Sequence, residues 1–391
     1  MYQQLKQIVF ITCIVCCSLK LQAQSRGTFK QLTDSIAVLE NSKNHAALIA
    51  MGKLAIHDKI DYYSLRMSLG NAYLNLGNYQ NAYFQYNQAF KFDPSSLMAV
   101  QNMRTCAILI GQTGLSNYFN PSLGIANKRL QKIYVETGSK LSNRTDSIQN
   151  MYYAHLGLLL SMNKNIETYL GYFYCTQKST LYDVIQHQYL GMVNIIASPT
   201  VQFKLGLSYL QCVVDDHTQN SQQTISNYTE AIAVQKQFNK VNLGVNATIG
   251  RLNKKQQWQI GASLKYAPKG NDKLGLQFNP ILQNQDNQYT VIYNPGISVR
   301  LKSNTWLIGS YSYANTTNYI EQEGFIVNNN YDLTKDKISL MLNYKTANNK
   351  DFYICYQFEN KARKYIEPVY YSEINQAYSF QTVIIGYTLK N

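Results

Sequence analysis

Residues 241–250 read VNLGVNATIG, and their side chains alternate in character along the chain. Apolar residues occupy the odd positions from Val241 to Ile249, whereas the even positions from Asn242 to Gly250 are small or polar. A period of two is typical of a β-strand with one apolar and one polar face. The pattern returns at 258–266, 291–301, 338–345, 352–359 and 383–389. Residues 129–390 are therefore predicted to form an antiparallel sheet of many strands.

A closed transmembrane barrel is favoured over a soluble β-sandwich. Charged residues make up only 15% of the chain, against about 25% in soluble domains, while the mean hydropathy of −0.29 argues against a bundle of membrane helices. Short connections alternate with longer polar ones, expected at 252–257, 283–288, 315–336 and 360–376 among others, as in outer-membrane barrels. About 14 strands result, with 12 to 16 left open, so the fold class is α+β, mainly β.

Aromatic residues support the same prediction. Tyrosine accounts for 33 of the 391 residues. Rings near strand ends fit the two aromatic girdles at the lipid headgroups. The candidates are Tyr152, Tyr172, Tyr174, Tyr209, Tyr266, Trp306, Tyr344, Phe358 and Tyr387. Core packing of a large sandwich is the alternative.

The N-terminus predicts export. Lys6 precedes an apolar core of about 12 residues, and Leu21-Gln22-Ala23 supplies a small residue before a cut ahead of Gln24. We therefore expect a signal peptide at 1–23, an outer-membrane location in a Gram-negative cell, and a periplasmic N-terminal domain.

Residues 27–118 have the three- and four-residue apolar spacing of amphipathic helices. Within them, nine residues stand at the spacing of the tetratricopeptide repeat (TPR): Leu69, Gly70, Tyr73, Gly77, Tyr79, Ala82, Tyr86, Ala89 and Pro94. Gly70 and Ala82 would let two helices approach closely. Residues 63–96 thus resemble the TPR family, departing from it at Arg66 where tryptophan is usual. The resemblance implies a docking surface for a periplasmic protein, and a structural spacer or plug is the alternative.

Basic side chains fall on the polar faces of the expected strands. They are Lys132, Lys204, Lys265, Arg300 and Lys345, against Glu136 and Glu359. Because charge on the lipid face costs several kcal/mol at mid-membrane, we expect these residues to face the lumen. They could attract an anionic solute or polymer, or could pair with acids, tyrosines and water in a filled lumen.

No catalytic, cofactor or metal site is predicted. The five histidines are scattered, Asp215-Asp216-His217 lacks a visible third ligand, and no phosphate-binding loop joins a strand to a helix. Cys106, Cys175, Cys212 and Cys355 form no CxxC pair. The net charge of +14 suits contact with membrane lipid, lipopolysaccharide or an acidic polymer in an exported chain, rather than nucleic acid.

Helices followed by a barrel resemble the YaiO-type family of TPR-barrel proteins and the exopolysaccharide exporters. An accessory barrel of a secretion system is a third possibility. The preferred hypothesis is a non-enzymatic component that docks a periplasmic partner in surface assembly, secretion or polysaccharide export. The alternatives are a small anion-preferring pore and, more distantly, an outer-membrane lipid hydrolase or acyltransferase.

Overall fold

The computed structural model describes residues 29–144, 148–179, 182–217, 219–321, 326–346, 350–366 and 373–390. The chain separates into two compact units, Met1–Cys106 and Ala107–Asn391. The expected signal peptide, residues 1–23, lies outside the described residues. The division between the units falls inside the region 27–118 that the sequence groups as one helical domain.

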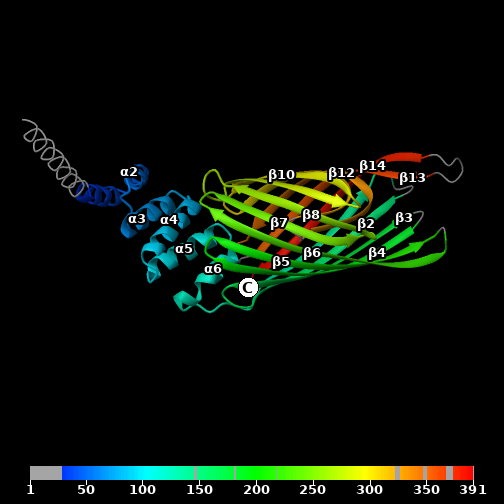
Figure 1. Ribbon diagram of the computed structural model, residues 1–391, viewed down its shortest axis with the longest axis horizontal. Coiled ribbons are helices and arrows are strands. Elements are labelled where there is room, and N and C mark those ends of the chain that lie inside the picture. The colour runs from blue at the N-terminus through cyan, green and yellow to red at the C-terminus, as the bar shows by residue number, and fades with distance from the viewer. Residues whose placement is uncertain are drawn as a thin grey trace, which may run out of the picture. The chain divides into compact units, whose positions relative to one another are not determined.

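The first unit is built from helices joined by short turns (Figure 1). They are a helix at 29–41, α2 (His45–His57), α3 (Tyr63–Asn75), α4 (Tyr79–Phe92) and most of α5 (Leu97–Leu109). Asn44 and Asn78 cap α2 and α4 by accepting backbone N–H bonds. Gly77, at φ +68°, makes the left-handed turn between α3 and α4 that glycine allows.

Several of the TPR-like residues lie at the contact between α3 and α4. Leu69, Ala82, Tyr86 and Ala89 are fully buried. Gly70 lies directly under the Tyr86 ring, because a Cβ built at Gly70 would stand 2.4 Å from Tyr86 Cε1. The close approach that the sequence predicts at Gly70 is therefore present. Membership of the TPR family remains a hypothesis.

Arg66 replaces the expected tryptophan with a buried polar contact. Its guanidinium donates two hydrogen bonds to Asp61, both at 2.6 Å, and a third to Gln85 at 2.7 Å. Only 8% of Arg66 is exposed. The residue thus joins the start of α3 to α4 through charge-assisted hydrogen bonds rather than through an aromatic ring.

The second unit is a closed antiparallel barrel of 14 strands, which confirms the predicted fold class and strand number (Figure 1). Each strand pairs with its neighbours in sequence, and β1 closes the ring against β14. The strands are β1 (Leu130–Ser142), β2 (Ile148–Ser161), β3 (Ile166–Ser179), β4 (Tyr182–Ser198), β5 (Val201–Asp216), β6 (Ser221–Phe238), β7 (Val241–Leu252), β8 (Lys255–Tyr266), β9 (Leu274–Gln285), β10 (Gln288–Lys302), β11 (Thr305–Glu321), β12 (Ile326–Lys345), β13 (Lys350–Ile366) and β14 (Glu373–Lys390).

The two faces of the barrel follow the alternation in the sequence. On β7 and β8, Val245 and Ile260 point outward and are 62% and 56% exposed, whereas Thr248 and Gln259 point inward and are 3% and 2% exposed. An apolar exterior and a polar interior are what a bilayer requires of a closed barrel. The barrel fold therefore matches that of outer-membrane proteins.

Several connections are shorter than the sequence suggests. The expected outer loops at 252–257 and 283–288 are two-residue turns, because Asn253-Lys254 and Asp286-Asn287 all adopt positive φ, as type I′ hairpins require. In the regions 315–336 and 360–376, β11, β12, β13 and β14 continue well into the sequence expected as loop. Polar strand extensions and polar loops have the same composition, so composition alone did not separate them.

Trp306 is one girdle candidate that the structure places differently. It lies in register with Arg300 of β10 and Asn343 of β12, on the inward face. The ammonium of Lys345 stands 4.4 Å from its ring centroid, at cation–π distance. All three residues of the run Trp306-Leu307-Ile308 are apolar, so the sequence does not indicate which of them face the lumen.

The four cysteines expected in the mature chain are all free thiols. Burial raises the pKa of the Cys106 thiol in α5 to about 12, so this thiol stays protonated at neutral pH.

Candidate functional site in the barrel lumen

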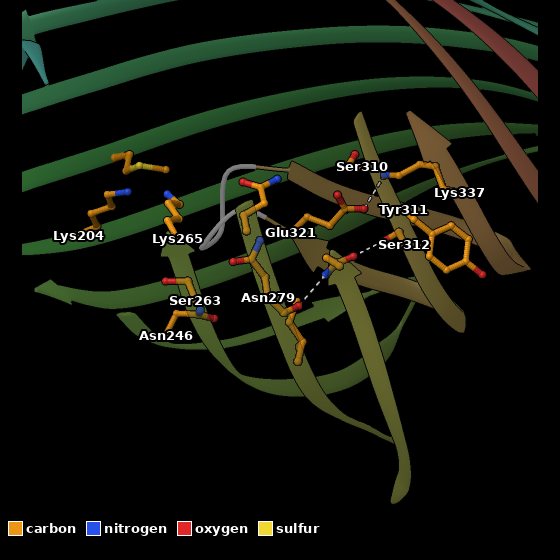
Figure 2. Close-up of a pocket in the computed structure, with 14 residues that line it drawn as sticks. Lys204, Asn246, Ser263, Lys265, Asn279, Ser310, Tyr311, Ser312, Glu321 and Lys337 are labelled. Carbon is orange, nitrogen blue, oxygen red and sulfur yellow. Dashed lines mark hydrogen bonds and ion pairs between the residues drawn. The ribbon is translucent and has the colours of Figure 1, made fainter. Parts of the chain in front are cut away.

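A polar cavity of about 400 Å³ lies inside the barrel (Figure 2). We call it the lumen chamber. Its wall comes from eight strands, β4, β5 and β7 to β12, and includes the end of β11. The lining consists largely of amides, hydroxyls and lysines: Lys204, Asn246, Ser263, Lys265, Gln277, Asn279, Asn294, Ser310, Ser312, Glu321 and Lys337, with Met192, Ile281 and Tyr311.

The wall of the chamber is preorganised by hydrogen bonds between neighbouring strands. Asn294 of β10 donates to the backbone carbonyl of Asn279 on β9 at 3.2 Å, and Ser312 of β11 donates to the Asn294 carbonyl oxygen. Figure 2 shows these bonds running along one side of the cavity. Side chains held in this way present fixed donors and acceptors to a polar solute.

The C-terminal end of β11, residues 314–321, is folded into the lumen. We call this segment the inner tip. In the sheet, β11 pairs only with β10 and β12. Nevertheless Ile320 packs with Leu210 of β5 and Leu252 of β7, all at most 3% exposed. Because these strands are not neighbours of β11, such contacts can be made only across the barrel interior.

Hydrogen bonds hold the inner tip against the opposite wall. Asn253, in the β7–β8 turn, donates to the side chain of Asn318 at 3.0 Å, and Gln283 of β9 donates to the Asn318 carbonyl. The Ile320 N–H donates to the Gln259 side chain of β8 at 3.3 Å. The bend that allows this begins at Asn315, where φ is +45° and the pairing with β12 shifts register.

An ion pair fixes the end of the inner tip. Glu321 Oε1 is 2.6 Å from Lys337 Nζ on β12, and the two side chains are only 14% and 10% exposed. Lys337 also stands 5.7 Å from the centroid of the Tyr319 ring, which is buried. We call the Glu321–Lys337 pair the latch. The latch therefore connects the inner tip to the wall of the lumen chamber at β12.

The opposite side of the lumen is lined by tyrosines seated on glycines. Glu136 of β1 accepts hydrogen bonds from Tyr153 of β2, at 2.7 Å, and from Tyr353 of β13. The Tyr353 ring lies over Gly386 of β14, where no Cβ would fit. Nearby, His155 contacts the Tyr169 hydroxyl at 2.6 Å. On this side of the lumen, tyrosine rings and their hydrogen bonds therefore occupy part of the interior.

The five basic residues expected in the lumen have different surroundings. Lys204 and Lys265 line the chamber. Arg300 lies near the turn end of β10, 2.9 Å from Asp272, and Lys345 lies over Trp306. Lys132 is in register with Lys390, whose ammonium is 2.6 Å from Asp351.

Further inward lysines, among them Lys140, Lys337 and Lys361, were not singled out from the sequence. Lys140 and Lys361 contact Glu359 at 2.7 and 3.6 Å. Lys361 falls in the region expected as the outer loop 360–376, and Lys337 directly follows the loop expected at 315–336. Lys140 could have been predicted, because it lies an even number of residues from Lys132 and so points to the same face of β1.

A short helix, α6 (Thr113–Phe119), belongs to the barrel unit and contacts β4. Its Leu115 and Phe119 are each 3% exposed. Gly114 lies so close to the carboxylate of Glu167, at the turn end of β3, that a Cβ would stand 2.2 Å from Oε2. The helix therefore packs against the end of the barrel where β3 begins.

Two classes of feature are absent from the part of the chain that the structure describes. None of its helices has the length and apolarity to span a membrane. Within the same residues, no three histidine, cysteine or acidic side chains gather closely enough to hold a metal ion.

Comparison with known proteins gives fold likeness only. No family model and no curated protein matches the chain. Among solved structures, the toluene transporter TodX of P. putida is 8% identical, with 73% of this chain and 94% of that chain covered at a TM-score of 0.49. A FadL homologue of Pseudomonas aeruginosa is also 8% identical, covering 70% and 93% at 0.45. The NalP translocator domain of Neisseria meningitidis is 12% identical, covering 75% and 97% at 0.33.

The closed ring of strands, its apolar exterior and its polar interior together define an outer-membrane β-barrel. The resemblance to YaiO-type proteins remains a hypothesis.

Proposed function

We propose that the barrel passes small polar solutes across the outer membrane, with a preference for anions. The solute binds in the lumen chamber on its way through. The observation that carries this proposal is the lining of the chamber, in which Lys204 and Lys265 stand among amides and hydroxyls. Its volume of about 400 Å³ is within the range of small-molecule sites.

Electrostatics favours anions over cations in this position. Three lysines, Lys204, Lys265 and Lys337, line the chamber against one carboxylate, that of Glu321, so the lining as a whole carries more positive than negative charge. A passage with walls of low dielectric focuses such a field and raises the local concentration of anions. Amide and hydroxyl groups then supply hydrogen bonds for the polar parts of the solute.

Planar-bilayer recording of the purified full chain tests the proposal. The reversal potential in a salt gradient is expected to indicate anion preference. The double variant Lys204→Gln, Lys265→Gln should lose that preference and should slow anion entry by about tenfold at low salt. Lys236→Gln is the control, because Lys236 lies on the outer face over the Phe238 ring at 4.9 Å. Cation preference in the native protein, or equal effects of the lumen and control variants, would contradict the proposal.

Docking of a periplasmic protein by the helical unit is a second candidate. The observation in its favour is a set of apolar side chains on this unit that its own packing leaves open. Leu54 on α2 and Leu97 and Met98 on α5 are 65%, 61% and 64% exposed. Exposed apolar residues in a helical unit offer a surface to a protein partner.

A further inference from the structure

A tyrosine row crosses the outer face of the barrel. Tyr172 of β3, Tyr189 of β4, Tyr209 of β5 and Tyr228 of β6 are directly paired from strand to strand. The Tyr172 hydroxyl is bonded to His187 at 2.8 Å and the Tyr209 hydroxyl to Ser226 at 3.1 Å. His187 lies two residues nearer the outer end of β4 than Tyr189, and Ser226 lies two residues nearer the outer end of β6 than Tyr228. The hydroxyls of the row are thus drawn toward the polar border, as in an aromatic girdle.

A groove of about 510 Å³ runs beside this row. It arises at Gly191 of β4, an outward position at which an added Cβ would meet no atom within 4 Å. The neighbours of Gly191 in register are Leu170 and Leu207, and the tyrosines 189, 209 and 228 complete the border. Leu207 is 65% exposed. The outward side chains that border the groove are therefore leucines and tyrosines, with the single exception of Glu230.

A carboxylate lies in the groove, on the same level of the barrel wall as Gly191 and Leu207. Glu230 of β6 lines the groove and points outward, paired in register with Leu207 and Ile249 and flanked on its own strand by Tyr228 and Ile232. Within the described residues, no side chain forms an ion pair or hydrogen bond with Glu230. A charge on the lipid-facing surface is costly unless something neutralises it.

We infer that the groove binds the ammonium headgroup of a lipid. The ammonium pairs with Glu230 beside the tyrosine rings, to which cations are attracted, and one acyl chain lies over Gly191. Charge complementarity selects this occupant: the groove offers a negative carboxylate and aromatic rings, so a lipid with an anionic headgroup and no amine is disfavoured. The site is separate from the lumen and does not depend on what the lumen carries.

Native mass spectrometry of the full chain, released from detergent micelles, tests the inference. Phosphatidylethanolamine and phosphatidylglycerol with identical acyl chains are the two probes. The native protein should retain the ethanolamine lipid about fivefold to tenfold better. Glu230→Gln should abolish the preference, and Gly191→Leu should remove retention of both lipids by filling the groove.

Gly309→Leu is the matched control. Gly309 is an outward glycine of β11 between Ile297 and Leu340, with space for a side chain and no carboxylate beside it. This variant should keep the native preference, and heat-modifiable migration on gels reports insertion for every variant. Equal retention of the two lipids, an unaffected Glu230→Gln protein, or a dimer that Gly191→Leu dissociates would overturn the inference, the last because a second copy would then occupy the groove.

Discussion

At the scale of single residues, Gly70 has no room for a side chain. A Cβ there would stand 2.4 Å from the Tyr86 ring, and Tyr86 is fully buried with its hydroxyl donating to Asn71 at 2.8 Å. The ring therefore has no free space into which it could move. We predict that Gly70→Leu, alone or with Ala82→Leu, destabilises this unit by roughly 1 to 3 kcal/mol per site.

Limited proteolysis of the inserted full chain measures this effect, because residues 29–106 should be cut faster while the barrel stays protected. Lys53→Leu, at an exposed position of α2, is the control and should not change the cleavage rate. Capture of a periplasmic partner should fall in the Gly70 variant only. Undiminished capture with an unfolded helical unit would remove the docking hypothesis.

At the scale of elements, the inner tip of β11 depends on the latch. Removing Lys337 takes away the ammonium that lies 2.6 Å from the mostly buried Glu321 carboxylate, and breaking a buried pair costs up to about 3 to 5 kcal/mol. We predict that Lys337→Gln releases the tip from the lumen and increases single-channel conductance. The swapped variant Glu321→Lys, Lys337→Glu should restore the native value.

Lys255→Gln is the control for the latch, because Lys255 and Asp286 form a looser pair at 3.8 Å with both side chains about half exposed. Exposed pairs contribute little, so this variant should conduct like the native protein. Unchanged conductance in Lys337→Gln would mean that the hydrogen bonds of the tip with Asn253, Gln259 and Gln283 hold it without the latch.

At the scale of the whole molecule, the barrel depends on the pairing of β1 with β14. Removal of residues 373–390 would leave β1 and β13 as open edges, and unpaired backbone groups cannot be satisfied within a bilayer. We predict that this truncation abolishes heat-modifiable migration and recovery in the outer-membrane fraction. Deletion of residues 29–106 should preserve both, because the second unit has its own closed sheet. Loss of both on that deletion would show that the units fold together.

The sequence by itself determined the strands, their inward and outward faces and the helical hairpin. Alternation with a period of two is a local property of the sequence. It is strict in this barrel because one face of each strand contacts lipid and the other faces a polar interior. The same reasoning predicts that Lys204 and Lys265 face the interior, and both line the chamber. It was uninformative where alternation lapses, as at Trp306.

Only the tertiary structure decided what fills the lumen. Residues 315–321, NTTNYIE, have the composition of a polar loop. Nevertheless Tyr319 is buried with Ile281 of β9 and Ile292 of β10, and Ile320 is buried with Leu210 of β5 and Leu252 of β7. The Lys140–Glu359 pair joins residues 219 positions apart. Such contacts depend on barrel closure, which brings distant strands face to face, and no local pattern records which side chains then meet. The groove beside Glu230 has the same origin, since four strands must lie in register before one glycine and one carboxylate share a surface.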